Sequence, residues 1–440
     1  MTIARSICVG FLGTILLGTL LLLLPGSTVD GGFHPLIALF TSTSAVCVTG
    51  LAVVDTGTYF TFWGQLVILL LIQVGGLGYM TTNTFLLILI GRRVDLRQRV
   101  ALQESFERPF GSGSRSLIRA IVWMTVIFEL TGTIALLPLF ADADLPLWQA
   151  LFHSISAWNN AGFSLFPDSL TQYRGNAIAN LVVPLLIISG GLGYQILLEL
   201  FGWTKNLVER RQSRYGFSMH FKVATSTTVT LLVLGTLAFL LVDATGPQVP
   251  DVLSLPEKFL AAWFQSVTTR TAGFNTLNIG QLTDATLFII ISFMFVGASP
   301  GGTGGGIKTT TLRILLGSAR STLRGDSEVV MYERRLPVAT ILKAVAVLCG
   351  SALVAIGTTV LLAFLNQNMR FIDLLFESVS AFATVGLSTG ITSQVTPLSQ
   401  LVLVATMYVG RVGVLVFVSA ILGDSHPTAV KYPEENLLVG

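Results

Sequence analysis

Long apolar runs recur along the whole chain, and polar stretches separate them. A helix needs roughly 20 residues to cross about 30 Å of hydrocarbon at 1.5 Å per residue. Runs of this kind lie at Ile7–Leu24, Leu117–Leu139, Val223–Leu241 and Ile341–Leu365. We predict a membrane-spanning helix in each. The first run leads into Pro25-Gly26 rather than a small-residue cleavage site, so we expect a retained helix and not a signal peptide.

Each long run is followed by a short segment, and the four short segments resemble one another. They end in Gly50, Gly162, Gly273 and Gly386, which are separated by 112, 111 and 113 residues. A nearly constant period over a whole chain indicates an internal duplication. The segments are Ser42-Thr-Ser-Ala-Val-Cys-Val-Thr-Gly50-Leu, Ser154-Ile-Ser-Ala-Trp-Asn-Asn-Ala-Gly162-Phe, Ser266-Val-Thr-Thr-Arg-Thr-Ala-Gly273-Phe and Ser378-Val-Ser-Ala-Phe-Ala-Thr-Val-Gly386-Leu, of which the third is one residue shorter.

The parts of each repeat come in one order, which predicts its local structure. A long apolar run precedes a polar loop, and an amphipathic stretch such as Leu147–Trp158 or Ile372–Phe382 then leads to the glycine. These stretches are too short to span a bilayer and suit re-entrant half-helices. Non-helical backbone at membrane depth survives only where protein buries it or water lines it. A second apolar run follows each glycine, at Phe62–Ile90, Ala179–Phe201, Leu287–Val296 and Leu398–Leu422.

This layout predicts an all-α membrane protein of four tandem helix–pore-loop–helix units around one pseudo-fourfold pore. We place unit 1 at residues 1–91, unit 2 at 92–205, unit 3 at 206–320 and unit 4 at 321–424, followed by a C-terminal tail at 425–440. Unit 3 also carries a predicted intramembrane gating loop, because its second apolar run is interrupted.

Composition agrees with a chain that lies mostly in lipid. Of the 440 residues, 52% are hydrophobic and only 11% are charged, whereas soluble domains carry about 25% charged residues. So little charge cannot cover a water-facing surface of this length. The three cysteines and four histidines are dispersed, which indicates neither a disulfide framework nor a metal cluster.

Basic residues gather in the connections between units. Arg92–Arg119 and Lys308–Lys343 each hold seven Lys or Arg, and Gly202–Lys222 holds five. Cytoplasmic loops carry the excess of Lys and Arg, so we expect cytoplasmic connections and glycine segments that open outward. Ordinary topology bias explains the inner arginines by itself.

The opposite face carries four basic residues and eleven acids. A net-negative outer mouth would raise the local concentration of cations. A solvated face without that role is the alternative for some of these acids. The basic residues are Arg174, Lys258, Arg270 and Arg370, and the acids are Asp30, Asp55, Asp142, Asp144, Asp168, Asp243, Asp251, Glu257, Asp284, Asp373 and Glu377.

The glycine segments offer chemistry that suits a cation leaving water. Backbone carbonyls can replace a hydration shell when several converge, and glycine helps because it tolerates positive φ and has no Cβ. The half-helix before each glycine points its partially negative C-terminal end at the same place. The segments contain no Asp or Glu, which argues against a divalent-cation ring. The candidate ion-contacting residues are Val48, Thr49, Gly50, Leu51, Asn160, Ala161, Gly162, Phe163, Thr271, Ala272, Gly273, Phe274, Thr384, Val385, Gly386 and Leu387.

These segments resemble the selectivity filters of the Trk/Ktr/HKT superfamily of potassium transporters, over essentially the whole chain. The resemblance is carried by Thr49-Gly50-Leu51-Ala-Val-Val-Asp55-Thr-Gly, Asn159-Asn-Ala-Gly-Phe-Ser164, Arg270-Thr-Ala-Gly-Phe-Asn275 and Thr384-Val-Gly-Leu387, and is closest to the Ktr membrane subunit. In that family four filter glycines go with potassium selection, whereas serine in the first goes with sodium conduction in some plant members. The resemblance implies gated potassium uptake, with sodium coupling left open; a sodium or less selective monovalent-cation transporter is the alternative.

Six glycines and a proline interrupt the second apolar run of unit 3, and no apolar helix is expected to continue through them. The stretch is not a phosphate-binding loop, because Ile307 rather than glycine precedes Lys308. The resemblance implies an intramembrane loop that occludes the pore below the filter, and a merely kinked helix is the alternative. The candidate gate residues are Gly297, Ser299, Pro300, Gly301, Gly302, Thr303, Gly304, Gly305, Gly306, Lys308 and Arg411.

Arg411 belongs to this gate on energetic grounds. It lies within the last apolar run, in Val409-Gly-Arg-Val-Gly413, and an arginine at membrane depth costs on the order of 2.5–3.5 kcal/mol on insertion scales. We therefore predict that it binds the carbonyls of Gly301–Gly306, closes the pore toward the cytoplasm and opposes cations electrostatically.

Two further motifs at membrane depth have less specific readings. The sequence Gly-Gly-Leu-Gly-Tyr begins at both Gly75 and Gly190, and small residues of this kind are expected to pack helices closely. Glu129 and Glu199 are each either a proton or sodium relay or a residue near a helix end.

Other classes of function fit less well. The inverted repeats of a secondary transporter with alternating access would give two halves, whereas this chain shows four copies in the same sense. No Ser/His/Asp, Cys/His or paired-carboxylate arrangement shares one loop, so we predict that the chain is not an enzyme. A structural scaffold would not need four filter-like loops.

Regulation is expected to come from another polypeptide. The largest inner loop, Lys308–Lys343, is far shorter than the roughly 100 residues of a soluble domain. The resemblance implies a homodimer and a cytoplasmic ring of RCK-type subunits, with nucleotide bound only on that partner. Docking would use Arg92–Arg119, Lys205–Arg214 and Arg313–Arg335, and the tail Ser425–Gly440 resembles the family's dimer contact. The resemblance also implies a bacterial-type plasma (inner) membrane, with lipid around the chain and no nucleic-acid partner.

Overall fold

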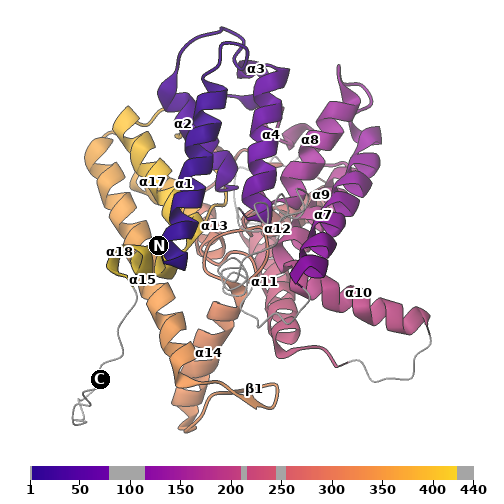
Figure 1. The fold of residues 1–440 in the computed structure, drawn as a ribbon, viewed down its shortest axis with the longest axis vertical. Helices are drawn as coiled ribbons and strands as arrows, with labels where there is room; N and C mark the ends of the chain where they lie inside the picture. Colours follow the sequence, from indigo (N-terminus) through magenta and orange to yellow (C-terminus); the bar gives the residue numbers. More distant parts are fainter. Residues whose placement is uncertain (1, 79–113, 210–215, 244–253, 424–440) are drawn as a thin grey trace.

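The computed structural model describes residues 2–78, 114–209, 216–243 and 254–423, and nearly all of their regular secondary structure is helical (Figure 1). Unit 1 contains α1 (Ile3–Leu22), α2 (Pro35–Val46), α3 (Thr56–Tyr59) and α4 (Phe62–Leu77). Unit 2 contains α7 (Ser114–Leu136), η1 (Leu137–Phe140), α8 (Pro146–Trp158), η2 (Thr171–Tyr173), α9 (Ala177–Leu192) and most of α10 (Tyr194–Val208). Unit 3 contains α11 (Met219–Asp243), α12 (Leu255–Thr268), η3 (Ile279–Gln281), α13 (Asp284–Met294) and most of α14 (Thr309–Arg324). Both α10 and α14 run a few residues past the unit boundaries predicted at 205 and 320. Unit 4 contains β1 (Val330–Met331), β2 (Arg334–Arg335), α15 (Val338–Leu365), α16 (Phe371–Phe382), α17 (Pro397–Val412) and α18 (Val414–Leu422).

Four helices of the described residues are long and apolar enough to cross a membrane. They are Ile3–Leu22, Ile118–Phe140, Met219–Val242 and Val338–Leu365, and they coincide with the four long apolar runs of the sequence. About a third or less of the most apolar part of each is buried within the protein. The rest is available to lipid, as in a multi-pass membrane protein.

The second apolar runs are less continuous than the sequence predicted. Ala179–Phe201 and Leu398–Leu422 were expected as single runs, but α9 and α10 meet at Gly193 with a bend of 103°, and α17 and α18 meet at Gly413 with a bend of 96°. Both glycines have a φ near +90°, a conformation that cannot continue a right-handed helix. Interruption of the second apolar run is therefore not confined to unit 3. Unit 3 differs by the length of its interruption, residues 295–308.

Helix contacts close into a ring. Each short helix of the four units packs on the long helix that precedes it, as α2 does on α1 and α16 on α15. Each also packs on the second helix of the preceding unit: α8 on α4, α12 on α9, α16 on α13 and α2 on α17. The last of these contacts joins the two ends of the described chain.

Serines help to hold the short helices in place. Ser42 donates to the carbonyl of Ile15, Ser154 to that of Glu129 and Ser266 to that of Leu232, each at 2.7–2.8 Å. Each bond joins a short helix to the long helix before it, and in each case a glycine of the long helix makes room. In unit 4 the corresponding Ser378 bonds within its own helix, to Leu374.

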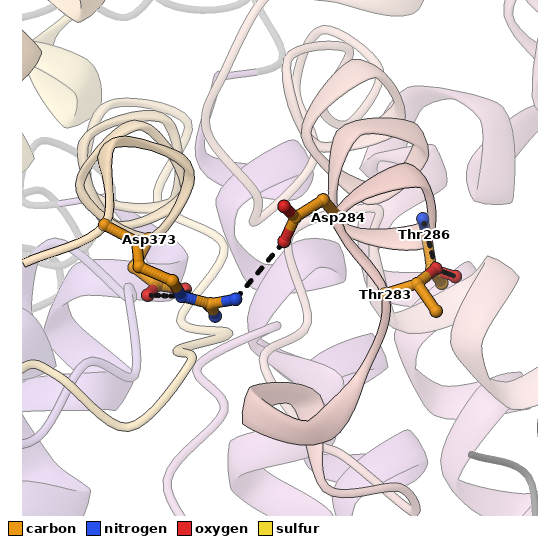
Figure 2. Close-up of polar contacts among 5 residues, drawn as sticks. Thr283, Asp284, Thr286 and Asp373 are labelled. Atoms are coloured by element: carbon orange, nitrogen blue, oxygen red, sulfur yellow. Dashed lines mark hydrogen bonds and ion pairs between the residues drawn. The ribbon is translucent and has the colours of Figure 1, made fainter. Parts of the chain in front are cut away.

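An ion pair joins units 3 and 4 at the end of the molecule where the loops after the glycines lie, which we call the outer end. Arg370 donates to Asp373 on α16 at 2.8 Å and to Asp284 at the start of α13 at 3.3 Å (Figure 2). Both carboxylates sit in the first turn of a helix, where the helix dipole favours negative charge. Arg370 and Asp284 are more than half exposed, so this pair contributes only about 0–1 kcal/mol.

Several charges assigned to the outer face are buried instead. Arg270 is 7% exposed, Asp373 is 5% exposed and Glu377 is fully buried. They lie on the short helices or in the glycine segments, which enter the protein rather than remain at its surface. The expected excess of outer acids is therefore smaller than the sequence count. Asp251 lies outside the described residues.

Of the connections between units, the described elements α10, α14 and the β1–β2 hairpin lie at the opposite, inner end (Figure 1). The hairpin pairs Met331 with Arg334, and its turn residues Tyr332 and Glu333 both have positive φ, as a type I′ turn requires. Sequence analysis did not predict this hairpin. Most of Arg92–Arg119, the end of Lys205–Arg214 and the tail Ser425–Gly440 lie outside the described residues.

Glycines of the second helices pack against the ends of the short helices. Gly75 faces the carbonyl of Val46 and Gly190 that of Trp158, the last residues of α2 and α8. Gly410 faces the carbonyl of Phe382 in the same way. The prediction of close packing is confirmed for Gly75 and Gly190.

We expect Gly190→Ala to destabilise the protein by about 1–3 kcal/mol, the usual cost of overpacking. A Cβ at this position would meet the Trp158 carbonyl and also approach Asn160 and Thr303 at 3.0 and 3.1 Å. Thermal unfolding of the detergent-solubilised protein would measure the loss. Gly357→Ala is the matched control, since nothing lies within 4 Å of its Cβ position; equal stability of the two variants would contradict the packing argument.

Candidate functional site

The four glycines approach one another in a closed ring. A Cβ on Gly50 would lie 2.5 Å from the carbonyl oxygen of Ala161, one on Gly162 2.8 Å from that of Ala272, and one on Gly273 2.6 Å from that of Val385. A Cβ on Gly386 would meet the carbonyl of Thr49 and closes the circle. Each glycine thus faces the residue that precedes the next glycine, and no larger residue fits without moving backbone.

The backbone has one conformation in all four segments. Gly50, Gly162, Gly273 and Gly386 have φ between +69° and +92°. The residue two positions earlier also has positive φ, although it carries a side chain: Val48, Asn160, Thr271 and Thr384, at 51–66°. Such residues cost of order 1 kcal/mol or more and persist only where the surroundings impose them. The same unfavourable φ at four matched positions indicates that the surrounding structure imposes this conformation, and that it places backbone groups rather than side chains.

Hydroxyl groups on the short helices hold these backbones, a feature that sequence analysis did not single out. Ser156, Thr268 and Ser380 donate to the carbonyls of Phe163, Phe274 and Leu387, the residues after the glycines, at 2.8, 2.5 and 2.6 Å. In unit 1 the amide of Gly50 donates to Ser44 at 3.1 Å. The available signal was a Ser or Thr five or six residues before every glycine.

The side chains of the segments are turned into the protein. All twelve non-glycine residues of the candidate set are buried, from fully buried to 2% exposed. The hydroxyls of Thr49, Thr271 and Thr384 are buried without a protein partner. Among the described residues no cluster of three His, Cys, Asp or Glu could hold a metal ion. The groups available to a cation are therefore carbonyls and hydroxyls.

The 297–308 loop lies against the inner side of the segments. Its Thr303 hydroxyl donates to the side chain of Asn160 at 3.2 Å, and Gly304 and Gly305 face the hydroxyls of Thr271 and Thr384 so closely that a Cβ would collide with them. Gly302 and Gly297 face backbone in the same way. The loop is compact, non-helical backbone rather than a kinked helix.

Backbone hydrogen bonds join this loop to the bend between α9 and α10. The amides of Ser299 and Thr303 donate to the carbonyls of Gly191 and Gly190, at 3.0 and 3.1 Å. Gly301 accepts from the amide of Tyr194 at 3.3 Å. The bend at Gly193 thus supplies partners for the loop, which satisfies polar backbone that lipid could not.

Three cationic side chains donate to carbonyls of the loop. Lys308 reaches the carbonyl of Gly304 at 2.7 Å and Arg270 that of Gly297 at 3.1 Å. Arg411 donates to the carbonyls of Thr303 and of Gly75. Arg411 therefore joins α17, the loop and α4. Sequence analysis named Lys308 and Arg411 as gate residues but placed Arg270 on the outer face, where its burial now excludes it.

The two glutamates at membrane depth differ in their surroundings. Glu129 is 5% exposed on α7 and accepts from Gln73 at 2.7 Å and Asn159 at 3.1 Å. It sits inside α7 rather than near its end, and it ties α4 and α8 together. Glu199 accepts from the amide and hydroxyl of Ser218 at 3.0 and 2.7 Å, close to the start of α11.

An open cavity of about 520 Å³ lies on the outer side of the ring. The loops that follow the glycines of units 2, 3 and 4 line it, and among its lining residues are Asp168, Asn275, Thr276, Ser388 and Thr389. Hydroxyl, amide and carboxylate oxygens face this space. These oxygens are suitable ligands for a hydrated cation next to the narrower ring of glycine segments.

Comparison with known proteins agrees with this arrangement. Residues 10–425 match the family model of TrkH, described as cation transport protein. This chain belongs to the TrkH family. The family consists of cation transport proteins and is not a class of enzyme.

Curated relatives align with this TrkH-family chain over nearly its whole length. The Ktr system potassium uptake protein B of Bacillus subtilis is 36% identical over 99% of this chain and 96% of its own length. The protein of the same name from Vibrio alginolyticus is also 36% identical, over 99% and 94%. The potassium/sodium uptake protein NtpJ of Enterococcus hirae is 34% identical, over 99% and 97%.

A solved structure shares the fold. The potassium transporter TrkH from Vibrio parahaemolyticus superposes with a TM-score of 0.72 at 18% identity, over 94% of this chain and 84% of that one. At this identity the likeness concerns the fold of the TrkH-family chain alone.

We expect Thr268→Val to lower stability by about 1–3 kcal/mol, because the carbonyl of Phe274 loses its buried donor while the side-chain shape is kept. Thermal unfolding would measure this loss. Thr236→Val is the matched control, since its buried hydroxyl only bonds the carbonyl of Leu232 in its own helix. A smaller loss of stability in Thr268→Val than in Thr236→Val would contradict a special role for the hydrogen bond from Thr268 to Phe274.

Proposed function

We propose that this TrkH-family chain is the pore-forming subunit of a potassium uptake system and that its four glycine segments form the selectivity filter. The ring of close approaches between the glycines and the carbonyls of Ala161, Ala272, Val385 and Thr49 carries this proposal. Four backbones that meet so closely can offer carbonyls in place of a hydration shell. The names of the relatives supply the cargo, since both Ktr relatives are potassium uptake proteins.

The pseudo-fourfold arrangement of the units is part of the proposal. It is supported by the ring of contacts from α4 to α8, α9 to α12, α13 to α16 and α17 to α2. It is also supported by the equal backbone conformation of the four segments. In such a pore the short helices aim their C-terminal ends at the centre, where a cation is favoured.

Uptake in this proposal follows the membrane potential. The potential supplies roughly 2.3 kcal/mol per charge per 100 mV. At about 1.4 kcal/mol per factor of ten, this sustains on the order of 40-fold accumulation without another ion. Sodium coupling is therefore not required by the energetics.

The 297–308 loop and Arg411 act as the gate in this proposal. The loop lies directly under the glycine segments, and the three cations Arg270, Lys308 and Arg411 hold its carbonyls. Those carbonyls are less available to a passing ion while they accept from the cationic side chains. Positive charge at this level also raises the barrier for a cation. Opening requires that the loop or Arg411 leave this position.

The proposed setting is a bacterial-type plasma membrane with cytoplasmic inter-unit segments. Basic residues on the inner-end helix α14, among them Arg313, Arg320 and Arg324, support this orientation. A homodimer, and a cytoplasmic RCK-type ring that binds the nucleotide, complete the proposed assembly. The word system in the names of the Ktr relatives supports a partner of some kind.

The second candidate is a less selective transporter of monovalent cations. The name of the Enterococcus relative, a potassium/sodium uptake protein at 34% identity, is the observation that favours it. The two functions differ in how strongly the segments reject sodium.

Expression in bacteria that lack their own potassium importers tests the cargo, with rubidium uptake as the readout. We expect rescue of growth at low potassium, stronger with a ring subunit, and at least tenfold loss of rubidium over sodium discrimination in Gly50→Ser. A Cβ there collides with the Ala161 carbonyl and strains a φ of +92°. Equal uptake of both ions by the unmodified chain would favour the second candidate, and no uptake with any partner would remove potassium as the cargo.

Arg411→Ala tests the gate. The variant releases the carbonyls of Thr303 and Gly75, so we expect uptake to rise severalfold and to depend less on the partner subunit. Arg320→Ala, on the exposed part of α14, is the control for loss of a positive charge. Unchanged flux and unchanged partner dependence in Arg411→Ala would refute the gate.

A further inference from the structure

Two of the four glycine segments have a second support, on the outer side of the glycine. It joins the short-helix residue nine positions before the glycine to the residue two positions after it. In unit 2 these residues are His153 and Ser164, and in unit 4 they are Glu377 and Ser388. Neither pair belongs to the candidate set derived from the sequence.

In unit 2 the pair is a fully satisfied network. His153 is completely buried, and its Nδ1 lies 2.8 Å from the carbonyl of Gln149. A carbonyl can only accept, so this contact assigns the ring proton to Nδ1 and leaves Nε2 to accept from the Ser164 hydroxyl at 3.0 Å. The Ser164 oxygen in turn accepts from the amide of Phe166 at 3.0 Å. The loop that leaves the second glycine is thereby tied to α8.

In unit 4 a carboxylate takes the place of the imidazole. Glu377 is completely buried and accepts from the hydroxyls of Ser388 and Thr392, the latter at 3.1 Å. Ser388 also accepts from the amide of Gly390 at 2.9 Å. The described residues offer Glu377 no ion-pair partner. These hydroxyl groups hold its carboxyl group in a part of the protein that lies beside the ring of glycines.

Units 1 and 3 lack this support. The corresponding residues of unit 1 are Thr41 and Ala52, and alanine has no polar side chain. In unit 3, whose segment is one residue shorter, they are Gln265, which directly precedes Ser266, and Asn275. Both polar atoms of the Gln265 amide are buried without a partner, and Asn275 donates to the carbonyl of Leu277.

The supported segments face each other. The ring order runs through Gly50, Gly162, Gly273 and Gly386, so units 2 and 4 stand on opposite sides of the axis. Ser388 also lines the 520 Å³ outer cavity, as do Pro167 and Asp168 from the loop after Ser164. The supports therefore fix two opposite walls at the point where a cation would pass from the cavity to the ring.

We propose that the His153–Ser164 and Glu377–Ser388 pairs are a diagonal brace that sets the width of the filter entrance and so contributes to ion selectivity. This rests on the proposed potassium filter. The brace residues are positioning residues: they act through the loops that they hold. The unbraced diagonal, units 1 and 3, is left freer to adjust.

Uptake of rubidium against sodium in proteoliposomes tests the brace, with the variants Ser388→Ala, Ser164→Ala and Glu377→Gln. We expect transport to persist and discrimination to fall about fivefold to tenfold in Ser388→Ala and Ser164→Ala, as loss of one buried hydrogen bond predicts. Glu377→Gln keeps an acceptor for the Ser388 hydroxyl, so its discrimination should stay closer to that of the unmodified chain than the discrimination of Glu377→Ala. Thr359→Ala is the control, because its buried hydroxyl bonds only Ala355 in its own helix.

A double variant separates bracing from unrelated damage. If Glu377 acts through Ser388, discrimination in Glu377→Ala/Ser388→Ala equals that of Glu377→Ala alone, whereas fully additive losses overturn the brace. The difference in thermal stability between potassium and sodium solutions is a readout that does not require transport. We expect this difference to be larger in the unmodified protein than in the variants. Unchanged discrimination and unchanged ion-specific stabilisation in every variant would overturn the brace and leave the proposed function intact. A wild-type chain that shows neither uptake nor potassium-specific stabilisation overturns both.

Discussion

The need to satisfy polar backbone away from water governs this structure. Residues 297–308 and the four glycine segments are non-helical yet enclosed among apolar helices, where an unpaired amide or carbonyl costs several kcal/mol. The chain meets this cost with donors from elsewhere: hydroxyls of the short helices, backbone of the Gly190–Gly193 bend, and the side chains of Arg270, Lys308 and Arg411.

Close backbone approach is the second consequence of that constraint. Glycine at positions 50, 162, 273 and 386 lets the segments meet, while glycine at 75, 190 and 410 lets the second helices press against the ends of the short helices. The two sets depend on each other, because a short helix pushed outward would carry its segment with it. Tight packing of backbone on backbone therefore constrains the spacing of the ring.

The four units share some structural features and differ in others. All four units share the φ pattern, and in all four a hydroxyl of the short helix bonds the backbone of the glycine segment. In unit 1 the hydroxyl accepts, because the Gly50 amide donates to Ser44. The differences have positions of their own: the long loop in unit 3, the paired donors of Arg411 in unit 4 and the diagonal supports in units 2 and 4. Duplication supplied a scaffold of carbonyls, and the differences break its symmetry where control and selection would act.

The sequence by itself determined the helical class, the four repeats, the short helices and the glycines at their ends, because these follow from apolar length, spacing and backbone freedom that are local in the chain. It also placed Arg411 near the 297–308 loop, from the cost of burying its charge. Only the tertiary structure decided the bends at Gly193 and Gly413, the burial of Arg270 and Glu377, and the partners of Thr268, His153 and Ser388. These features depend on which distant part of the backbone a side chain contacts, as when Arg411 on α17 donates to Gly75 on α4. Periodicity along the sequence carries no information about such long-range contacts.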